Sequence, residues 1–198
     1  MKLKHYKKDA LEYIVVDDIY SEHELSLIKQ ELNSLIPYLK SVEEVKSDFN
    51  VNDVTSYKKN CLSLWVDDYY IEDRSRSNIL TFNRKLFGDD IVSFATNVNS
   101  YYGHLTYCNM DTTLLNFYQN TQHYKSHRDK TVITALTLFK IGDIQGGGLI
   151  FTKDDVKVDF KDNRMIIFPG CVYHETELIT TTPNSYRVSM AQFISYKE

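Results

Sequence analysis

Residues 114–130 read LLNFYQNTQHYKSHRDK, and this stretch decides the fold. It overlaps a segment, residues 112–119, that is short and rich in Thr, Phe and Tyr, as β-strands are. It ends in the step His127-Arg128-Asp129. Side chains two positions apart in an extended chain point to the same side, so His127 and Asp129 can reach one metal ion. A single H-x-D step also arises by chance, so a metal site can be inferred only together with residues elsewhere in the chain.

From about residue 105 onward, the hydrophobic pattern has a period of two. Short segments rich in Val, Ile, Thr, Phe and Tyr follow one another, separated by Gly, Asp, Asn or Pro. Strands at this spacing indicate a β-sandwich or a barrel. The predicted strands are residues 112–119, 131–140, 147–152, 164–169 and 185–196.

The first part of the chain predicts a strand followed by a helix. Residues 12–16, EYIVV, form a short apolar strand. Ser21 and Glu24 then have the spacing of a capping box, which supplies partners for the free amides at a helix start. Apolar residues at helical spacing follow, so we expect an amphipathic helix over 22–36 that ends before Pro37.

A second helical region is expected over residues 77–102, in two pieces that meet near Gly88. The polar residues 40–60 predict a long surface excursion or a weak hairpin. The predicted fold class is mainly β with flanking helices (α+β). We expect a single domain in which an N-terminal strand and helix support region, residues 1–104, packs on a β core formed by residues 105–198.

Composition and charge narrow the classes of function. The formal net charge of -4 at pH 7 weighs against a protein that grips a nucleic-acid backbone. Cys61, Cys108 and Cys171 are widely separated and form no C-x-x-C pair, which favours a reduced compartment. The first residues lack the apolar segment of a signal peptide, and no stretch approaches the roughly 18 apolar residues of a membrane span. We therefore predict a cytoplasmic protein without a membrane segment.

His174 supplies a third candidate metal ligand. It closes the segment FPGCVYH, residues 168–174, just after a short apolar strand. Two imidazoles and one carboxylate on one face of an octahedral ion leave three positions open, as in Fe(II) oxygenases. A closed four-ligand zinc site would not leave room for a bidentate co-substrate together with O2.

Arg187 is a charged residue in the otherwise apolar segment YRVSMAQF, residues 186–193. An unpaired buried charge is costly, so this guanidinium needs an anionic partner. Ser189 lies two positions further and points to the same side of a strand. Together they offer a guanidinium fork and a hydroxyl to a carboxylate, although a structural salt bridge at Arg187 remains an alternative.

At these residues the chain resembles the catalytic half of the Fe(II)/2-oxoglutarate dioxygenases, particularly their prolyl 4-hydroxylase-like branch. The resemblance covers about 80 residues in the order of that family, and the N-terminal strand and helix are similar to its entry elements. The fold that it implies is a double-stranded β-helix, or jelly roll. The segments that carry it are LLNFYQNTQHYKSHRDK, GGGLIF, NRMIIFPGCVYH and YRVSMAQF.

The resemblance also implies cofactors and roles. Its cofactor and co-substrates are Fe(II), 2-oxoglutarate and O2. His127, Asp129 and His174 become the iron ligands. Arg187 becomes the anchor of the distal carboxylate of 2-oxoglutarate, with Ser189 assisting.

Three further residues and a glycine turn match positions of the family. Tyr118 lies where some relatives place a hydroxyl near 2-oxoglutarate, and Tyr124 is a candidate for the pocket wall. Asn116, two residues before Tyr118, can face the same pocket. Residues 146–148 are glycines that match a turn opening the next core strand.

The other histidines lack the spacing of metal ligands, and packing or surface roles are expected for them. Trp65 either covers the pocket or packs in the core. The histidines concerned are His5, His23, His104 and His123.

The implied activity is hydroxylation of a C–H bond with release of succinate and CO2. The implied substrate is a prolyl or other amino-acid residue in a peptide or protein, or a free amino acid. Residues 40–78 and the region 104–111 would select it, and the sequence leaves open whether residues 40–78 close over the substrate as a lid. The sequence leaves the substrate and the oligomeric state open.

Two alternatives stay open. An AlkB-like demethylase of alkylated nucleobases has an N-x-Y step similar to Asn116-Phe117-Tyr118. That family carries a second Arg six residues after its co-substrate Arg, and here the position is Phe193. A cupin-like small-molecule binding module is the non-enzymatic alternative, and it predicts a missing ligand or a missing anchor.

Overall fold

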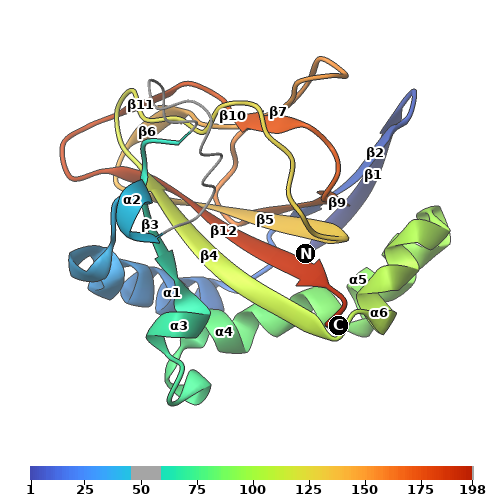
Figure 1. Cartoon of the computed structure of the whole chain (residues 1–198), viewed down its shortest axis with the longest axis horizontal. Coiled ribbons are helices and arrows are strands. Elements are labelled where there is room, and N and C mark those ends of the chain that lie inside the picture. The colour runs from blue at the N-terminus through green and yellow to red at the C-terminus, as the bar shows by residue number, and fades with distance from the viewer. Residues whose placement is uncertain (46–58, 198) are drawn as a thin grey trace.

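The computed structural model describes residues 1–45 and 59–197. Strands are the commonest regular elements of the described chain (Figure 1). The strands are β1 (Lys2–Lys8), β2 (Leu11–Asp17), β3 (Leu62–Trp65), β4 (Met110–Tyr118), β5 (Ile133–Ile141), β6 (Ile144–Gly146), β7 (Leu149–Phe151), β8 (Val156–Val158), β9 (Arg164–Pro169), β10 (His174–Thr176), β11 (Ile179–Thr181) and β12 (Tyr186–Ser195).

The helices gather on one side of the strands (Figure 1). The α-helices are α1 (Glu22–Leu35), α2 (Val42–Val45), α3 (Val66–Tyr69), α4 (Asn78–Phe82), α5 (Asp89–Val98) and α6 (His104–Tyr107). Short 3-10 helices are η1 (Ile36–Tyr38), η2 (Arg74–Arg76), η3 (Asn83–Phe87) and η4 (Ser100–Gly103). None of the helices in the described residues is long and apolar enough to cross a lipid bilayer.

A seven-stranded antiparallel sheet is the frame of the molecule, in the order β1-β2-β9-β5-β12-β4-β3. A three-stranded sheet, β10-β7-β8, and a two-stranded sheet, β11-β6, lie on its other side from the helices (Figure 1). Non-sequential neighbours such as β9-β5-β12-β4 arise because the chain passes back and forth between the two layers. This arrangement is a double-stranded β-helix, and the predicted fold class is confirmed.

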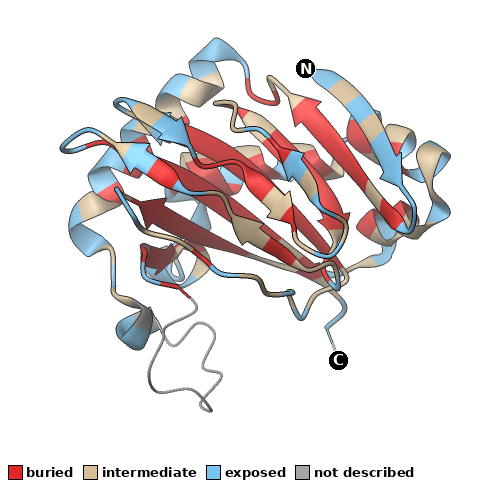
Figure 2. Cartoon of the chain, turned by 90° about the horizontal axis from the view of Figure 1, so that it is seen from above, coloured by how far each residue is buried: buried red, intermediate tan, exposed pale blue. Residues whose placement is uncertain are grey.

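The large sheet is buried on both faces over its central strands (Figure 2). One face meets the helices in a large hydrophobic cluster that includes Ile28, Leu115 and Met190. The opposite face meets the small sheets in a second cluster that includes Leu138 and Phe151. We call these the helix-facing side and the inner side. Strands buried on both faces are held in one register, because a slip by one residue would exchange the two sets of side chains.

Helix α1 forms as the sequence predicts. Ser21 accepts a hydrogen bond from the backbone of Glu24, and the Glu24 carboxylate accepts one from the backbone of Ser21. Ile28, Leu32 and Leu35 form its buried stripe against the sheet. The α-helix ends at Leu35, and Pro37 follows inside the 3-10 turn η1.

The longer predicted elements are confirmed, and short ones were missed. The helical region 77–102 consists of α4, η3, α5 and η4, with Gly88 as the residue before α5. Strand β1 was missed because its many lysines obscure the alternation of apolar and polar residues that indicates a strand, although lysine is common on edge strands. Strands β6, β8, β10 and β11 have three residues each, too few for a periodic signal. Most of the predicted excursion at 40–60 lies outside the described residues.

Candidate active site

His127, Asp129 and His174 form a cluster of possible metal ligands in the described part of the chain. The backbones of His127 and His174 pair as an isolated antiparallel bridge, with distances of 3.0 and 2.8 Å between amide nitrogen and carbonyl oxygen. Asp129 follows, its amide 2.9 Å from the carbonyl of Gly170. The chain therefore brings the H-x-D step beside the start of β10, and one potential ligand atom of each residue lies within 4.8 Å of the others.

The spacing of the ligand atoms suits a shared ion. The carboxylate of Asp129 lies 3.7 Å from Nε2 of His127 and 3.8 Å from Nε2 of His174. Atoms that bind one ion at about 2.1 Å lie roughly 3–4 Å from one another. Two imidazoles and one carboxylate form the donor set of non-haem Fe(II) sites. The three residues therefore fit such an ion.

Hydrogen bonds orient each of the three ligands. Nδ1 of His127 donates to the carbonyl of Lys125 at 2.8 Å, and Nδ1 of His174 donates to the carbonyl of Val172 at 3.0 Å. Because a carbonyl can only accept, the proton sits on Nδ1 and Nε2 is left with its lone pair. The hydroxyl of Thr134 donates to Oδ2 of Asp129 at 2.6 Å. The cluster is thus prepared to coordinate a cation.

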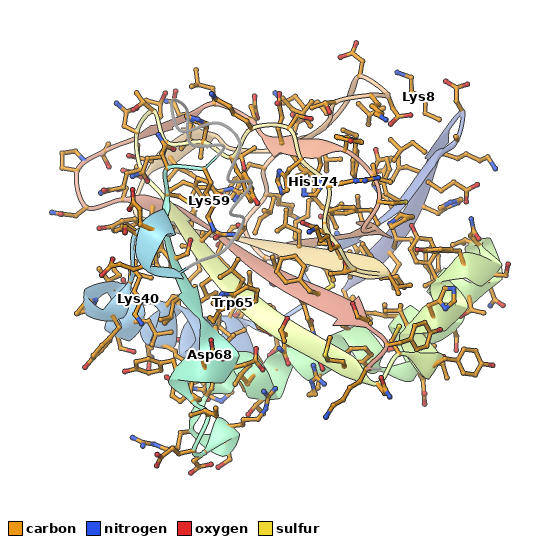
Figure 3. All side chains as sticks on the ribbon, viewed as in Figure 1. Lys8, Lys40, Lys59, Trp65, Asp68 and His174 are labelled. Carbon is orange, nitrogen blue, oxygen red and sulfur yellow. The ribbon has the colours of Figure 1, made fainter. Side chains whose placement is uncertain are left out.

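Aromatic rings fix the two imidazoles. Tyr124 stacks on His127 with ring centroids 3.5 Å apart and an interplanar angle of 10°. Phe168 meets His174 edge to face at 4.8 Å. His174 is 5% exposed and belongs to the inner side of the molecule, away from the helices (Figure 3). These contacts restrict ring rotation, which favours one ligand geometry.

Arg187 lies on the inner side of β12 and is 1% exposed. Its neighbour in the register is Tyr118 on β4, and its guanidinium lies 4.8 Å from the centre of the Tyr118 ring. Nε donates to the carbonyl of Gly147 at 3.0 Å. Within the described residues, the terminal nitrogens Nη1 and Nη2 have no hydrogen-bond partner.

The glycine turn makes room for this arginine. Gly147 has φ of +79°, and a Cβ there would lie 3.0 Å from Cγ of Arg187 and 3.2 Å from Ile179. A side chain would therefore be strained by the backbone and would press on the guanidinium. The glycine that sequence reasoning assigned to backbone geometry thus also shapes the surroundings of Arg187.

Burial sets the electrostatics around Arg187. Burial lowers the pKa of the Arg187 guanidinium from its ordinary value, with the nearby Tyr118 opposing this effect. Burial raises the pKa of the Tyr118 hydroxyl, and the neighbouring Cys61 raises it further. Burial also raises the pKa of the Cys61 thiol. Because arginine remains protonated in proteins, its unpaired nitrogens fit an anion such as a carboxylate, which can accept two hydrogen bonds at once.

Asn116 and Ser189 face the same inner side as Arg187. They are direct neighbours on β4 and β12 and are 3% and 1% exposed. The Asn116 side-chain oxygen accepts a hydrogen bond from Ser63 on β3 at 2.8 Å. Ser189 lies two residues after Arg187, at the next position on the same side of β12. Asn116 is hydrogen-bonded to Ser63 on β3.

No protein-family model matches this chain, and no curated protein matches it. Solved structures do match. A prolyl-4-hydroxylase from Pseudomonas putida shares 14% identity with a TM-score of 0.62, covering 94% of this chain and 93% of that one. A prolyl hydroxylase from Trichoplax adhaerens, in complex with a hypoxia inducible factor peptide fragment, shares 13% identity with a TM-score of 0.65 over 92% of this chain and 83% of that one. This is the fold of the Fe(II)/2-oxoglutarate oxygenases.

Another solved structure with this oxygenase fold contains a different small molecule. EctD from S. alaskensis, with 2-oxoglutarate and 5-hydroxyectoine, shares 13% identity with a TM-score of 0.54 over 92% of this chain and 72% of that one. Because the identities are so low, the likeness concerns the fold. The resemblance predicted from the sequence is confirmed at that level, and the substrate stays open.

Within the oxygenase fold, the predicted residues fall into two groups. The three ligands and Tyr124 form one group, since Tyr124 stacks on His127. Arg187 and Tyr118 form the other, with Ser189 beside them. The remaining histidines of the described residues lie outside the metal cluster, for example His104, whose Nδ1 is 2.5 Å from the Tyr196 hydroxyl.

Sequence reasoning missed several residues of the site. Thr134, which bonds to Asp129, looks like any threonine in a strand. Cys61 belongs to a buried cluster with Tyr118, Tyr124 and Ile179, and it precedes the unpredicted strand β3. The only available signal for Thr134 was its position five residues after the H-x-D step, on the inner side of β5.

Proposed function

We propose that the chain is an Fe(II)- and 2-oxoglutarate-dependent dioxygenase that hydroxylates a C–H bond and releases succinate and CO2. The observation that carries this proposal is the pairing of a three-ligand cluster with Arg187, a buried guanidinium whose terminal nitrogens lack partners in the described residues. The fold supports it, since solved structures with this fold include prolyl hydroxylases and a 2-oxoglutarate complex. We also propose that the chain is a single domain, because β1 to β3 share one sheet with β4, β5, β9 and β12.

Each residue has a role in this proposal. His127, Asp129 and His174 hold Fe(II) and leave the remaining positions for co-substrates. Arg187 binds the distal carboxylate of 2-oxoglutarate through Nη1 and Nη2, and Ser189 assists from the next inner-side position of β12. The bound metal, 2-oxoglutarate and O2 supply the oxidising power.

The chain itself orients the groups and excludes water. Thr134 holds the Asp129 carboxylate, and Tyr124 holds the His127 ring. Burial of Arg187 removes competing water from its nitrogens, so each hydrogen bond to a carboxylate is stronger than it would be in solvent. Tyr118 forms one wall of this pocket and Asn116 stiffens another through Ser63.

For the substrate we propose a prolyl or other amino-acid residue of a peptide or protein, or a free amino acid. Prolyl hydroxylases recur among the solved structures, and one of them is in complex with a peptide. Apolar side chains close to the metal ligands support a substrate that presents a C–H bond to the iron. Trp65 lies 5.9 Å from Phe193, which is the register neighbour of Thr134.

The test is succinate formation by protein that has been loaded with Fe(II) without oxygen and then given 2-oxoglutarate and O2. Wild-type protein should form succinate in an Fe(II)-dependent manner, and a panel of prolyl peptides and free amino acids should raise the rate for one member. Asp129→Ala and His174→Ala should abolish this stimulated turnover, because each removes one metal ligand. His104→Ala is the matched control and should retain it, since His104 lies outside the cluster.

Retained turnover in Asp129→Ala would overturn the ligand assignment. Metal binding without any 2-oxoglutarate binding, measured by calorimetry, would instead favour a binding module of cupin-like shape. Turnover stimulated by methylated oligonucleotides alone would favour the AlkB-like alternative.

A further inference from the structure

Exposed cations flank the metal ligands along the chain and on the neighbouring strand. Lys125, Arg128 and Lys130 alternate with the ligands of the H-x-D loop, and Lys153 follows β7. All four side chains are exposed. The chain as a whole carries a formal net charge of -4, so this concentration of positive charge differs from the rest of the molecule. We call these four residues the cationic rim.

Backbone pairing holds part of the cationic rim next to the site. Arg128 and Tyr173 each lie one residue from the bridge between His127 and His174, on the opposite side of the strands from the two imidazoles. The Arg128 guanidinium lies 5.9 Å from the centre of the Tyr173 ring. The ammonium of Lys153 lies 4.2 Å from the same ring, and the backbone of Thr152 bonds to that of Tyr173 at 3.1 Å. One aromatic side chain therefore contacts two cations, one residue along the backbone from the ligands and on the other face of the bridge.

The cationic rim is not neutralised within the described residues, where none of its four members forms a salt bridge with a carboxylate. Other basic residues do, for example Lys29 with Asp162 and Arg164 with Asp17. Asp154 and Asp155 follow Lys153 directly and bring two carboxylates close to the cationic rim, but neither forms a salt bridge with a rim residue in the described part of the chain; Lys8 donates to their backbone carbonyls at 2.6 and 3.3 Å. A cation on an aromatic face keeps its hydrogen-bond donors for a further partner.

We propose that the substrate of this site is acidic: a peptide or protein segment with carboxylates next to the residue that is oxidised. This rests on the proposed function, because the cationic rim matters through its closeness to the iron ligands. A peptide is favoured over a nucleic acid because the positive charges form a compact group on an acidic protein, whereas phosphate backbones are bound by extended basic faces. Carboxylates that reach the rim would be steered by it and would orient the neighbouring C–H bond.

The test is a binding measurement with defined peptides. A fluorescein-labelled peptide rich in glutamate around a central proline is compared with its glutamine and lysine counterparts, by fluorescence anisotropy with the Mn(II)- and 2-oxoglutarate-loaded protein without oxygen. The glutamate peptide should bind about tenfold more tightly than the glutamine peptide at low ionic strength, and the preference should shrink at high salt. The lysine peptide should bind most weakly.

Two charge reversals localise the effect. Lys153→Glu should lower the affinity for the glutamate peptide by about tenfold while leaving the affinity for the glutamine peptide nearly unchanged. Lys197→Glu makes the same charge change on an exposed residue next to the C-terminus, which lies on the helix side of the molecule, away from β7 and β10 (Figure 1). It should have little effect. Circular dichroism checks that both variants are folded.

Equal binding of the glutamate and glutamine peptides would overturn the inference, as would an equal loss in the two lysine variants. Tighter binding of a single-stranded oligonucleotide than of the glutamate peptide would replace it with a nucleic-acid substrate. Succinate formation without peptide separates this inference from the proposed function. Wild-type protein that forms succinate but ignores peptide charge contradicts only the substrate class, whereas absent succinate contradicts the proposed function itself.

Discussion

The two sides of β12 differ in chemistry although they belong to the same strand. On the helix-facing side, Val188, Met190 and Ile194 are fully buried and apolar, and the buried Gln192 near the strand end donates to Asp111. On the inner side, Arg187 and Ser189 are equally buried but polar. The apolar side chains fix the register of the strand in the sheet. The strand then holds its polar side chains in buried positions that they would not take up by burial of apolar surface alone.

Strand β4 repeats this division. Leu115 and Phe117 face the helices and are 0% exposed, whereas Asn116 and Tyr118 face inward. Because β4 and β12 are neighbours in register, their polar residues form one continuous surface. We therefore expect the helix-facing side to contribute stability and the inner side to contribute binding. Four predictions test this separation.

Replacing Arg187 should separate binding from stability most clearly. Arg187→Met should lower the affinity for 2-oxoglutarate by at least about a hundredfold, because two charge-assisted hydrogen bonds of about 1.5–3 kcal/mol each are lost. The free energy of unfolding of the ligand-free protein should stay the same or rise by about 1 kcal/mol, since a buried cation without a partner is removed. Calorimetry with Mn(II)-loaded protein and denaturant unfolding measure the two effects.

The control for Arg187 lies on another strand of the same sheet. Arg164→Met removes an arginine that is bonded to Asp17 at 2.6 Å, so it should lower stability and leave 2-oxoglutarate binding unchanged. Unaltered 2-oxoglutarate affinity in Arg187→Met would end the assignment of this residue as the anchor.

Met190 tests the opposite side of the same strand. Met190→Ala should cost about 2–5 kcal/mol in the free energy of unfolding, because it leaves a cavity against the helices. Ser189→Ala, one residue away, should cost less stability and should weaken 2-oxoglutarate binding several-fold. Denaturant unfolding and calorimetry on both variants measure this. Similar effects of the two substitutions on both quantities would contradict the separation of the two sides.

Thr134 sharpens the comparison at the metal ligands. Thr134→Val keeps the shape of the side chain but removes the hydrogen bond to Asp129, so the affinity for Fe(II) or Mn(II) should fall by about 10–100-fold. Thr137→Val is the matched control on the helix-facing side of β5 and should leave metal affinity unchanged. Metal titration monitored by tryptophan fluorescence measures both. A shift of the same size in the control would remove the case for a positioning role of Thr134.

The smallest expected effect concerns an ion pair at the margin of the helix-facing side. Lys7 at 2.5 Å and Asn99 at 2.8 Å lower the pKa of Glu12 from its ordinary value of 4.5 to about 2. A lowered folded-state pKa adds stability above the unfolded pKa, and this stability is lost as the pH falls from about 5 towards 2. Glu12→Gln should therefore reduce stability at pH 7 by less than about 1 kcal/mol, because Lys7 is exposed.

The measurement is the free energy of unfolding of wild type and Glu12→Gln at several pH values. The difference between them should vanish near pH 2. A difference that stays constant from pH 7 to pH 2 would mean that packing, and not the charge of Glu12, causes it. Glu22→Gln, at the start of α1, provides the comparison with another exposed acidic residue.

The sequence predicted the long helices and strands from their hydrophobic period, and the candidate site residues from the spacing of their motifs. Helix α1 and strands β4, β5, β9 and β12 were found because each has a long apolar period. Strand β7 was found as well, but the three-residue strands β6, β8, β10 and β11 were not, since pairing with distant segments, not local preference, makes them extended. The same reason explains why Thr134 and Cys61 were missed at the site.

What the sequence determined by itself is the chemistry available to this protein. The H-x-D step and His174 predict the set of metal-ligand atoms, and the isolated Arg187 predicts a buried positive charge. Both can be inferred from sequence because residue type and spacing are local properties. Only the tertiary structure decided that His127 and His174 pair across two segments, that Gly147 accepts a bond from Arg187, and that two of the cations share the ring of Tyr173. These contacts join residues far apart in the chain, and the double-stranded β-helix brings them together because both faces of its large sheet have to be buried.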